Sequence, residues 1–263
     1  MKTKSLSITK LLSAAFGLVM LSTTASASVI FDSGLPSGWD CTGTCGTAGA
    51  NGDITSSPFS GNYGWVATTN GVLGLGLTGL AGQTGSMLRS SLFAAAEHDD
   101  LKFYFNYVTS DGAGYADYAW ARLLDESYNQ VAMLFTARTL ASGTIVPGLG
   151  MPAPEATLNP GTVGIINGAP SWSPLGSSSG SCYSSGCGYT GWIESTFQIA
   201  AAGNYFLEFG AVNWSDSAYD SGLAFDGITV GGVEVGVPSV SEPGTLLLFG
   251  LALTFFARRK FKA

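Results

Sequence analysis

Aspartates beside apolar strands are the residues of this chain best suited to bind a ligand. Asp111 and Asp117 bracket a glycine-rich turn, and Asp226 shares a strand face with aliphatic residues. A carboxylate on such a face must be hydrogen-bonded, paired or metal-bound, because burying it bare costs on the order of several kcal/mol. Calcium takes oxygen ligands of this kind. We therefore expect Asp111, Asp117 and Asp226 to be ligands of a structural Ca²⁺, with Asp216 and Asp220 as further donors; the alternative is that they cap turns.

Aromatic side chains are the second group with binding chemistry, because their faces can stack on sugar rings. Sandwich cores also use tryptophan heavily, and Trp120 and Trp214 lie at or next to expected strands. Trp172 instead lies in a segment rich in proline and serine. We expect Trp120 and Trp214 to be in the core and Trp172 to be an exposed glycan contact.

Catalytic residues are not indicated by the sequence. The one histidine, His98, lies in an acidic turn at 97–100. Residues 176–180 match the G-x-S-x-G pattern, but that motif requires a strand before it and a helix after it, and here it falls in a serine/glycine run. We therefore expect a protein that is not an enzyme. The alternative is a glycan-active enzyme with paired carboxylates, although no pair is singled out.

Four cysteines lie in two short loops, Cys41 with Cys45 and Cys182 with Cys187. An even number of cysteines in an exported chain indicates disulfides, since the compartment is oxidising. The spacing favours two local bridges. Pairing between the two loops and a four-thiolate zinc site are the alternatives.

The elements that would position these residues are strands. Residues 101–108 and 205–211 alternate apolar and polar side chains, which is typical of strands buried on one face, and residues 223–230 are apolar on both faces. Further strands are expected at 63–68, 86–93, 117–124, 130–138 and 191–199. Short strands with polar turns predict an all-β fold, a β-sandwich or jelly roll.

One segment, 145–188, interrupts this pattern. It carries six of the ten prolines and a serine/glycine run. Long loops of this kind inside a compact domain are often functional. We expect one domain at 28–236 that contains this loop.

The N-terminal residues 1–27 have the pattern of a signal peptide. Three lysines precede an apolar run at 11–21, and Ala25 and Ala27 form a small-x-small cleavage site for signal peptidase. A single N-terminal transmembrane helix is the alternative. The segment predicts export, with a signal helix that is removed.

The C-terminal residues 237–263 combine a polar-proline motif, an apolar run and a basic end. Ser241, Glu242 and Pro243 precede an apolar run at 245–257, and three basic residues follow at 258–260. The run has 13 residues, fewer than the roughly 20 that cross a bilayer untilted, and basic residues stay on the cytoplasmic side. An ordinary membrane anchor and a buried helix with a basic end are the alternatives.

This tail closely resembles the PEP-CTERM sorting tail of Gram-negative bacteria that have an exosortase. Glu242 and Pro243 match the motif, and Ser241 replaces its first proline. The resemblance implies insertion of a C-terminal transmembrane helix, recognition and cleavage by an exosortase-type enzyme, and then release or attachment at the cell surface.

Charge separates the signal segment and the basic C-terminal end from the rest of the chain. The signal and the basic end hold seven of the 11 basic residues, so four remain against 18 acidic ones, a net charge of −14. Such a surface repels phosphate backbones, so we expect no nucleic-acid partner. It attracts cations, and it also favours solubility.

Residues 103–125 and 221–230 look like parts of the jelly-roll modules found in exported bacterial proteins, including many with PEP-CTERM tails. Carbohydrate-binding sandwiches carry similar closing strands. The resemblance implies a structural or adhesive protein of the cell surface or of an extracellular matrix such as a biofilm with its exopolysaccharide. The alternative is a carbohydrate-binding, lectin-like module that depends on calcium.

Overall fold

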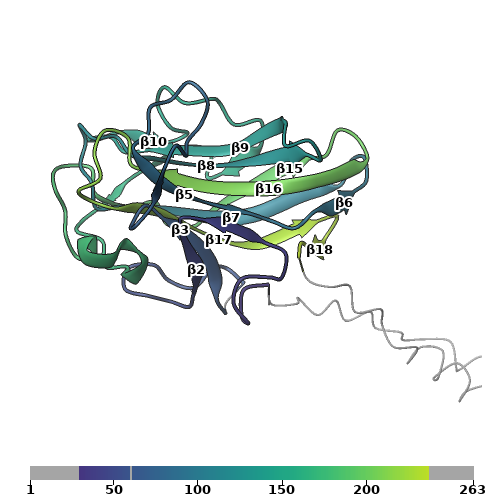
Figure 1. The fold of residues 1–263 in the computed structure, drawn as a ribbon, viewed down its shortest axis with the longest axis horizontal. Coiled ribbons are helices and arrows are strands. Elements are labelled where there is room, and N and C mark those ends of the chain that lie inside the picture. The colour runs from purple at the N-terminus through teal and green to yellow at the C-terminus, as the bar shows by residue number, and fades with distance from the viewer. Residues whose placement is uncertain (1–29, 60, 237–263) are drawn as a thin grey trace, which may run out of the picture.

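The computed structural model describes residues 30–59 and 61–236 as a sandwich of two antiparallel β-sheets (Figure 1). The predicted all-β sandwich is confirmed. The predicted signal helix, cleavage residues, sorting motif and transmembrane segment lie outside the described residues. No helix within the described ranges is long and apolar enough to cross a membrane.

The first sheet has seven strands, and its central path runs β1-β5-β16-β8-β9. Two short strands extend it, β4 beside β5 and β6 beside β16. The strands are β1 (Asp40–Thr42), β4 (Val72–Leu73), β5 (Thr84–Arg89), β6 (Phe93–Ala95), β8 (Tyr118–Asp125), β9 (Gln130–Arg138) and β16 (Gly203–Val212).

The second sheet has nine strands, and its central path runs β11-β15-β7-β17-β3-β2. β17 is central, as its apolar pattern predicts, because β7 and β3 pair with it on its two sides. The strands are β2 (Thr44–Ala48), β3 (Tyr63–Ala67), β7 (Asp100–Thr109), β11 (Thr157–Asn159), β13 (Ile166–Asn167), β14 (Gly188–Tyr189), β15 (Ile193–Gln198), β17 (Ser221–Val230) and β18 (Val233–Glu234).

The core lies between the sheets and is rich in phenylalanine. Phe209 of β16 stacks on Phe225 of β17 with ring centroids 4.0 Å apart, and Phe105 of β7 stacks on Phe135 of β9 at 3.8 Å. All four are fully buried. The alternating residues of β16 and β7 thus pack against β17 and β9 across the two layers, which is why their period-2 pattern predicts the fold.

The segment 145–188 is more structured than the predicted loop. It contributes β11 and β13 to the second sheet, and it also holds most of a separate two-stranded ribbon and the 3₁₀ turn η1 (Ser173–Ser178). The ribbon consists of β10 (Thr144–Val146) and β12 (Val163–Gly164). The segment is therefore a covering layer whose local strands satisfy its main chain.

The sandwich has two distinct ends. Ser221 starts β17 opposite Thr109, and Val230 ends it opposite Leu101; ten residues of strand span roughly 30 Å. The end at Ser221 gathers the segments 110–117, 179–187 and 213–220, and we call it the loop end. The end at Val230 leads into β18 and the last described residue, Gly236, and we call it the tail end; Figure 1 shows β18 there, with η1 toward the opposite side.

Candidate functional site

The loop end is held together by main-chain hydrogen bonds between its three segments. Ser110 N donates to Asp220 O at 3.0 Å, and Tyr183 N donates to Ser110 O at 3.1 Å. Ala113 N also donates to Ser185 O at 2.8 Å. The turn after β7 is therefore tied to both neighbouring segments.

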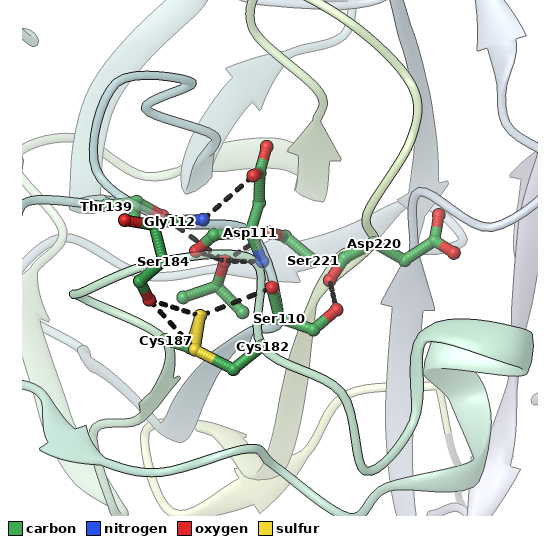
Figure 2. The surroundings of a disulfide bond; sticks show 10 residues. Ser110, Asp111, Gly112, Thr139, Cys182, Ser184, Cys187, Asp220 and Ser221 are labelled. Carbon is green, nitrogen blue, oxygen red and sulfur yellow. Dashed lines mark hydrogen bonds between the residues drawn. A yellow bond between two sulfur atoms is a disulfide. The ribbon is translucent and has the colours of Figure 1, made fainter.

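A disulfide closes the middle segment. Cys182 and Cys187 are bonded, and Cys41 and Cys45 form the second bridge, so both local pairings are confirmed over the pairing between loops. A Cβ added to Gly112 would lie 2.4 Å from Ser184 Cβ, so the closed loop packs directly on the turn after β7. Figure 2 shows this bridge close to Ser110 and Ser184.

Asp117 is the most deeply buried carboxylate of the loop end. It is 1% exposed, and it accepts hydrogen bonds from Trp214 N at 2.9 Å and from Ser221 Oγ at 2.7 Å. Burial raises its pKa well above the usual value, and the charge of Asp111 raises it further. All of these donors are neutral, so they satisfy the oxygens without balancing the charge.

Asp111 is buried with one oxygen unsatisfied. The residue is 2% exposed, and Oδ1 accepts from Gly112 N at 2.8 Å. Oδ2 has no hydrogen-bond partner among the described residues. Burial raises the pKa of Asp111 to about 6, against the lowering effect of the Gly112 N–H, and the charges of Asp216 and Asp220 add to the rise. A buried acceptor without a donor is unfavourable and needs an explanation.

The other two loop-end carboxylates also have neutral partners. Asp220 accepts from Thr68 Oγ1 at 3.1 Å and from Ser178 Oγ at 2.9 Å. Asp216 accepts from Ala218 N at 3.0 Å. Within the described ranges, the only arginine–carboxylate ion pairs are those of Glu208, elsewhere in the first sheet. These loop-end carboxylates form no ion pair among the described residues, although the loop end also carries Arg138, whose guanidinium donates to the main-chain oxygens of Ala116 and Leu149 and lies over the Trp214 ring.

Three tyrosines cover this end of the molecule. Tyr115 and Tyr183 meet edge to face with centroids 5.1 Å apart, and Tyr183 and Tyr219 lie 5.3 Å apart. The Tyr115 and Tyr183 hydroxyls are 3.4 Å apart. Tyr183 is 50% exposed, and each of the three segments supplies one ring. We call these residues the tyrosine triad.

The predicted calcium ligands do not come together. Asp111 and Asp117 lie at the loop end, whereas Asp226 lies in β17 opposite Tyr104 and accepts a hydrogen bond from Ser57 Oγ. Five residues of extended strand, roughly 16 Å, separate Asp226 from Ser221. The structure thus does not bring the three predicted residues together, and no three His, Cys, Asp or Glu side chains within the described ranges are placed to hold a metal ion.

Trp172 is a second correction. The indole is fully buried rather than exposed, and its Nε1 donates to Tyr63 OH at 2.9 Å. The turn η1 folds this part of the segment onto β3 and β17, and a Cβ on Gly222 would lie 2.7 Å from the ring. Trp172 therefore belongs to a core cluster and is not available to a glycan.

The aromatic residues that are available were missed. Tyr115, Tyr183 and Tyr219 lie in polar turns, and each is within four residues of an aspartate or a cysteine already selected as a site residue. That proximity was the usable signal, because turn segments beside the ends of central strands are where binding residues concentrate.

Catalytic geometry is not assembled around the serine and histidine of the sequence motifs. Ser178 Oγ donates to Asp220 at the loop end, whereas His98 precedes β7 at the tail end with a largely exposed side chain. Among the described residues, the histidine and this serine are thus at opposite ends of the sandwich.

Comparison with protein families identifies the C-terminal segment. A model of the PEP-CTERM protein-sorting motif matches residues 239–260. The chain carries a PEP-CTERM sorting motif. It is thus an exported protein of the Gram-negative type, sorted at the membrane by an exosortase. No curated protein matches the chain in sequence.

Solved structures give partial likenesses to this chain. The K1 cleaved adhesin domain of Lys-gingipain from Porphyromonas gingivalis W83 is 13% identical over 76% of this chain and 93% of that chain, with a TM-score of 0.39. The K3 cleaved adhesin domain of the same protein is 14% identical over 76% of this chain and 95% of that chain, with a TM-score of 0.35. The enzymatically active domain of bacteriophage CBA120 tailspike protein 4 is 12% identical over 79% of this chain and 21% of that chain, also with a TM-score of 0.35. At these TM-scores, nothing about ligand or activity is transferred to this chain.

Proposed function

We propose that this chain is a structural or adhesive protein of the cell surface or extracellular matrix, and that the β-sandwich acts there by binding rather than by catalysis. The observation that carries the proposal is the sorting motif at residues 239–260. An N-terminal segment of signal-peptide type supports the same route. The mature protein is then exposed to matrix polymers, not to intracellular partners.

The arrangement of the domain supports this role. The sorting motif follows Gly236, so it is joined to the tail end of the sandwich. The loop end lies roughly 30 Å away along β17. A domain attached to the membrane through its C-terminal segment can therefore present the tyrosine triad outward.

Cell fractionation tests the proposal. In an exosortase-bearing Gram-negative host, the wild-type chain should reach the surface or the medium, whereas deletion of the exosortase should retain it in the membrane. Replacing both Glu242 and Pro243 by alanine should have the same effect as the deletion. Ser241→Pro, which restores the usual motif, is the matched control and should be processed at least as well as wild type. Surface delivery that is independent of both the enzyme and the motif would contradict the proposal.

A second candidate function is carbohydrate binding, and the tyrosine triad favours it. Exposed aromatic rings beside carboxylates combine an apolar face with polar groups that fix orientation. A dependence of this binding on calcium stays a prediction. Calorimetry with Ca²⁺ and with EDTA tests it: heat of binding and a higher melting temperature are expected if an ion binds, and neither if it does not.

A further inference from the structure

We infer that the tyrosine triad and the carboxylates of the same turns form a binding site for an amine-bearing saccharide, a polymer of hexosamine with free amino groups. The inference rests on the second candidate function, carbohydrate binding, and adds the chemical class of the ligand. Its elements are three aromatic rings and a set of buried and half-buried carboxylates that form no ion pair among the described residues, because Arg138, the arginine at this end, is bonded to main-chain oxygens instead.

The charge balance selects a cationic ligand. Asp111, Asp117, Asp216 and Asp220 come from adjacent turns, and the hydrogen bonds that they accept come from neutral groups. Carboxylates that are desolvated and close together repel one another. A positive charge placed over them lowers that repulsion, whereas a uronate or sulfate would increase it.

Asp111 is the carboxylate of this cluster with the strongest expected effect on the tyrosine surface. Its residue is 2% exposed and its Oδ2 is without a partner among the described residues, so its charge is poorly neutralised by protein or solvent. Tyr183 N donates to Ser110 O at 3.1 Å and Tyr115 N donates to Gly112 O at 3.2 Å, so Asp111 lies beside the turns that carry these two rings. Asp111 is therefore a positioning residue: it acts on a ligand through the electrostatic potential at the tyrosine surface rather than by contact.

The tyrosines suit an ammonium group better than a bare metal ion. An ammonium is attracted to the faces of aromatic rings, and a sugar ring adds apolar contact and hydroxyl donors. Calcium takes six to eight oxygen ligands, and the described residues contain no group of three acidic side chains placed for it. Three aromatic rings with carboxylates in the same turns match an organic cation better than a metal ion.

The disulfide loop holds the central ring. Tyr183 follows Cys182 directly, and its main-chain N–H is bonded to Ser110 O at 3.1 Å. Tyr183 contacts both other tyrosines. The bridge Cys182–Cys187 shown in Figure 2 thus fixes the residue on which the triad depends.

Calorimetry with two matched oligosaccharides tests the inference. The full chain, purified in detergent from an oxidising export host, is titrated with glucosamine hexamer and with N-acetylglucosamine hexamer. The two share a backbone and differ only in acetylation of the amine, which removes its positive charge. We expect the free-amine hexamer to bind at least tenfold more tightly, and its affinity to fall as salt is raised, because exposed charges are screened.

Variants locate the site. Tyr183→Ala should weaken binding of the glucosamine hexamer at least tenfold, whereas Tyr128→Ala should leave it unchanged. Tyr128 is the matched control, because it is similarly exposed (54% against 50%) but lies in the β8–β9 turn at the tail end. Asp111→Asn should weaken binding several-fold without lowering the melting temperature, which a purely structural role would not produce.

The outcomes separate the two proposals. Equal binding of both hexamers overturns the inference of an amine-bearing ligand and leaves carbohydrate binding intact. Binding of neither hexamer overturns the inference, and absence of binding to a wider set of neutral glycans would then remove carbohydrate binding as well. A poly-lysine of equal charge that binds as tightly, or wild-type affinity in Tyr183→Ala, also overturns it, because the contact would then be a non-specific effect of net charge.

Discussion

Buried carboxylates at two places in the same sandwich, Glu208 in the first sheet and Asp111 and Asp117 at the loop end, have different partners. Glu208, in the middle of β16, is fully buried and accepts from Arg89 Nη2 at 2.9 Å and from Arg122 Nε at 2.6 Å. Asp111 and Asp117 at the loop end are almost as deeply buried, but they accept hydrogen bonds from neutral groups.

The difference shows which group is structural. The domain has four basic residues, and two of them are used on Glu208. A carboxylate with two guanidinium partners needs nothing else. Asp111 and Asp117 have no basic partner among the described residues, and burial raises their pKa values; carboxylates perturbed in this way are common at binding sites.

Breaking the Glu208 ion pair should give the largest effect. Arg122→Met leaves a fully buried carboxylate with Arg89 alone, and removing one partner of a buried pair costs about 3–5 kcal/mol. Urea denaturation measures the loss in the free energy of unfolding. Lys102→Met removes the same charge from an exposed position in β7 and should change it by less than about 0.5 kcal/mol. A loss below about 1 kcal/mol in Arg122→Met would remove the contrast between the two groups.

Removing the loop-end disulfide should have an intermediate effect. Replacing Cys182 and Cys187 by serine opens a short ring, and loop-closure entropy predicts a loss of about 2 kcal/mol. Replacing Cys41 and Cys45, a ring of similar length, is the matched control and should lower stability by a similar amount. Only the replacement of Cys182 and Cys187 should weaken binding of the glucosamine hexamer. Equal effects of the two pairs on binding would show that the loop end has no special role.

The pH dependence of stability should distinguish the loop end from an exposed carboxylate. The pKa of Asp111 is raised to about 6 from about 4 in the unfolded chain, so the folded state binds more protons between these values. The contribution of Asp111 to the free energy of unfolding is therefore largest below pH 4 and falls as the pH rises through 6. The pKa of Asp117 is also raised, so its contribution to the free energy of unfolding likewise falls as the pH rises.

Thermal unfolding at pH 5 and pH 7 measures this effect. The melting-temperature difference between the two pH values should shrink in Asp111→Asn, because the titrating group is gone. Asp125 is the control: hydrogen bonds from Asn129 lower its pKa, so its contribution is lost only at more acidic pH, and Asp125→Asn should leave the difference unchanged. An unaltered difference in Asp111→Asn would argue that its carboxylate is solvated.

The smallest effect is expected for Asp111→Asn at neutral pH. The amide oxygen can still accept from Gly112 N, while the buried charge disappears, so the free energy of unfolding should stay within about 1 kcal/mol of wild type or rise. Chemical denaturation at pH 7 measures it, beside Asp117→Asn. A loss above about 2 kcal/mol would mean that Asp111 has a stabilising partner and resembles Glu208.

Much of the fold follows from local pattern. The alternating residues of β7 and β16 and the continuous apolar run of β17 predict three long strands, and these lie where expected. The short spacing of the cysteines favours the local bridges that form. The short strands β1, β2 and β4 were not predicted, because two to five residues give too little periodicity.

The site was only half predictable. Asp111 and Asp117, two of the predicted ligands, lie together at the loop end, whereas the pairing of β17 places the third, Asp226, farther along the sandwich. Trp172 was assigned to solvent because it lies in a proline- and serine-rich segment, yet η1 packs it against Tyr63. Composition describes a segment and does not say which of its side chains turns inward.

The sequence by itself determined the route of this protein and its class of fold. Sorting enzymes and signal peptidases act on contiguous residues, and strand periodicity is a property of neighbours in the chain, so both can be seen without a structure. Only the tertiary structure decided which carboxylates meet a base and which do not, and that Tyr115, Tyr183 and Tyr219 form one surface. These residues are far apart in the sequence, and their proximity is produced by the register of β7, β16 and β17 and by the closed disulfide loop packed on Gly112.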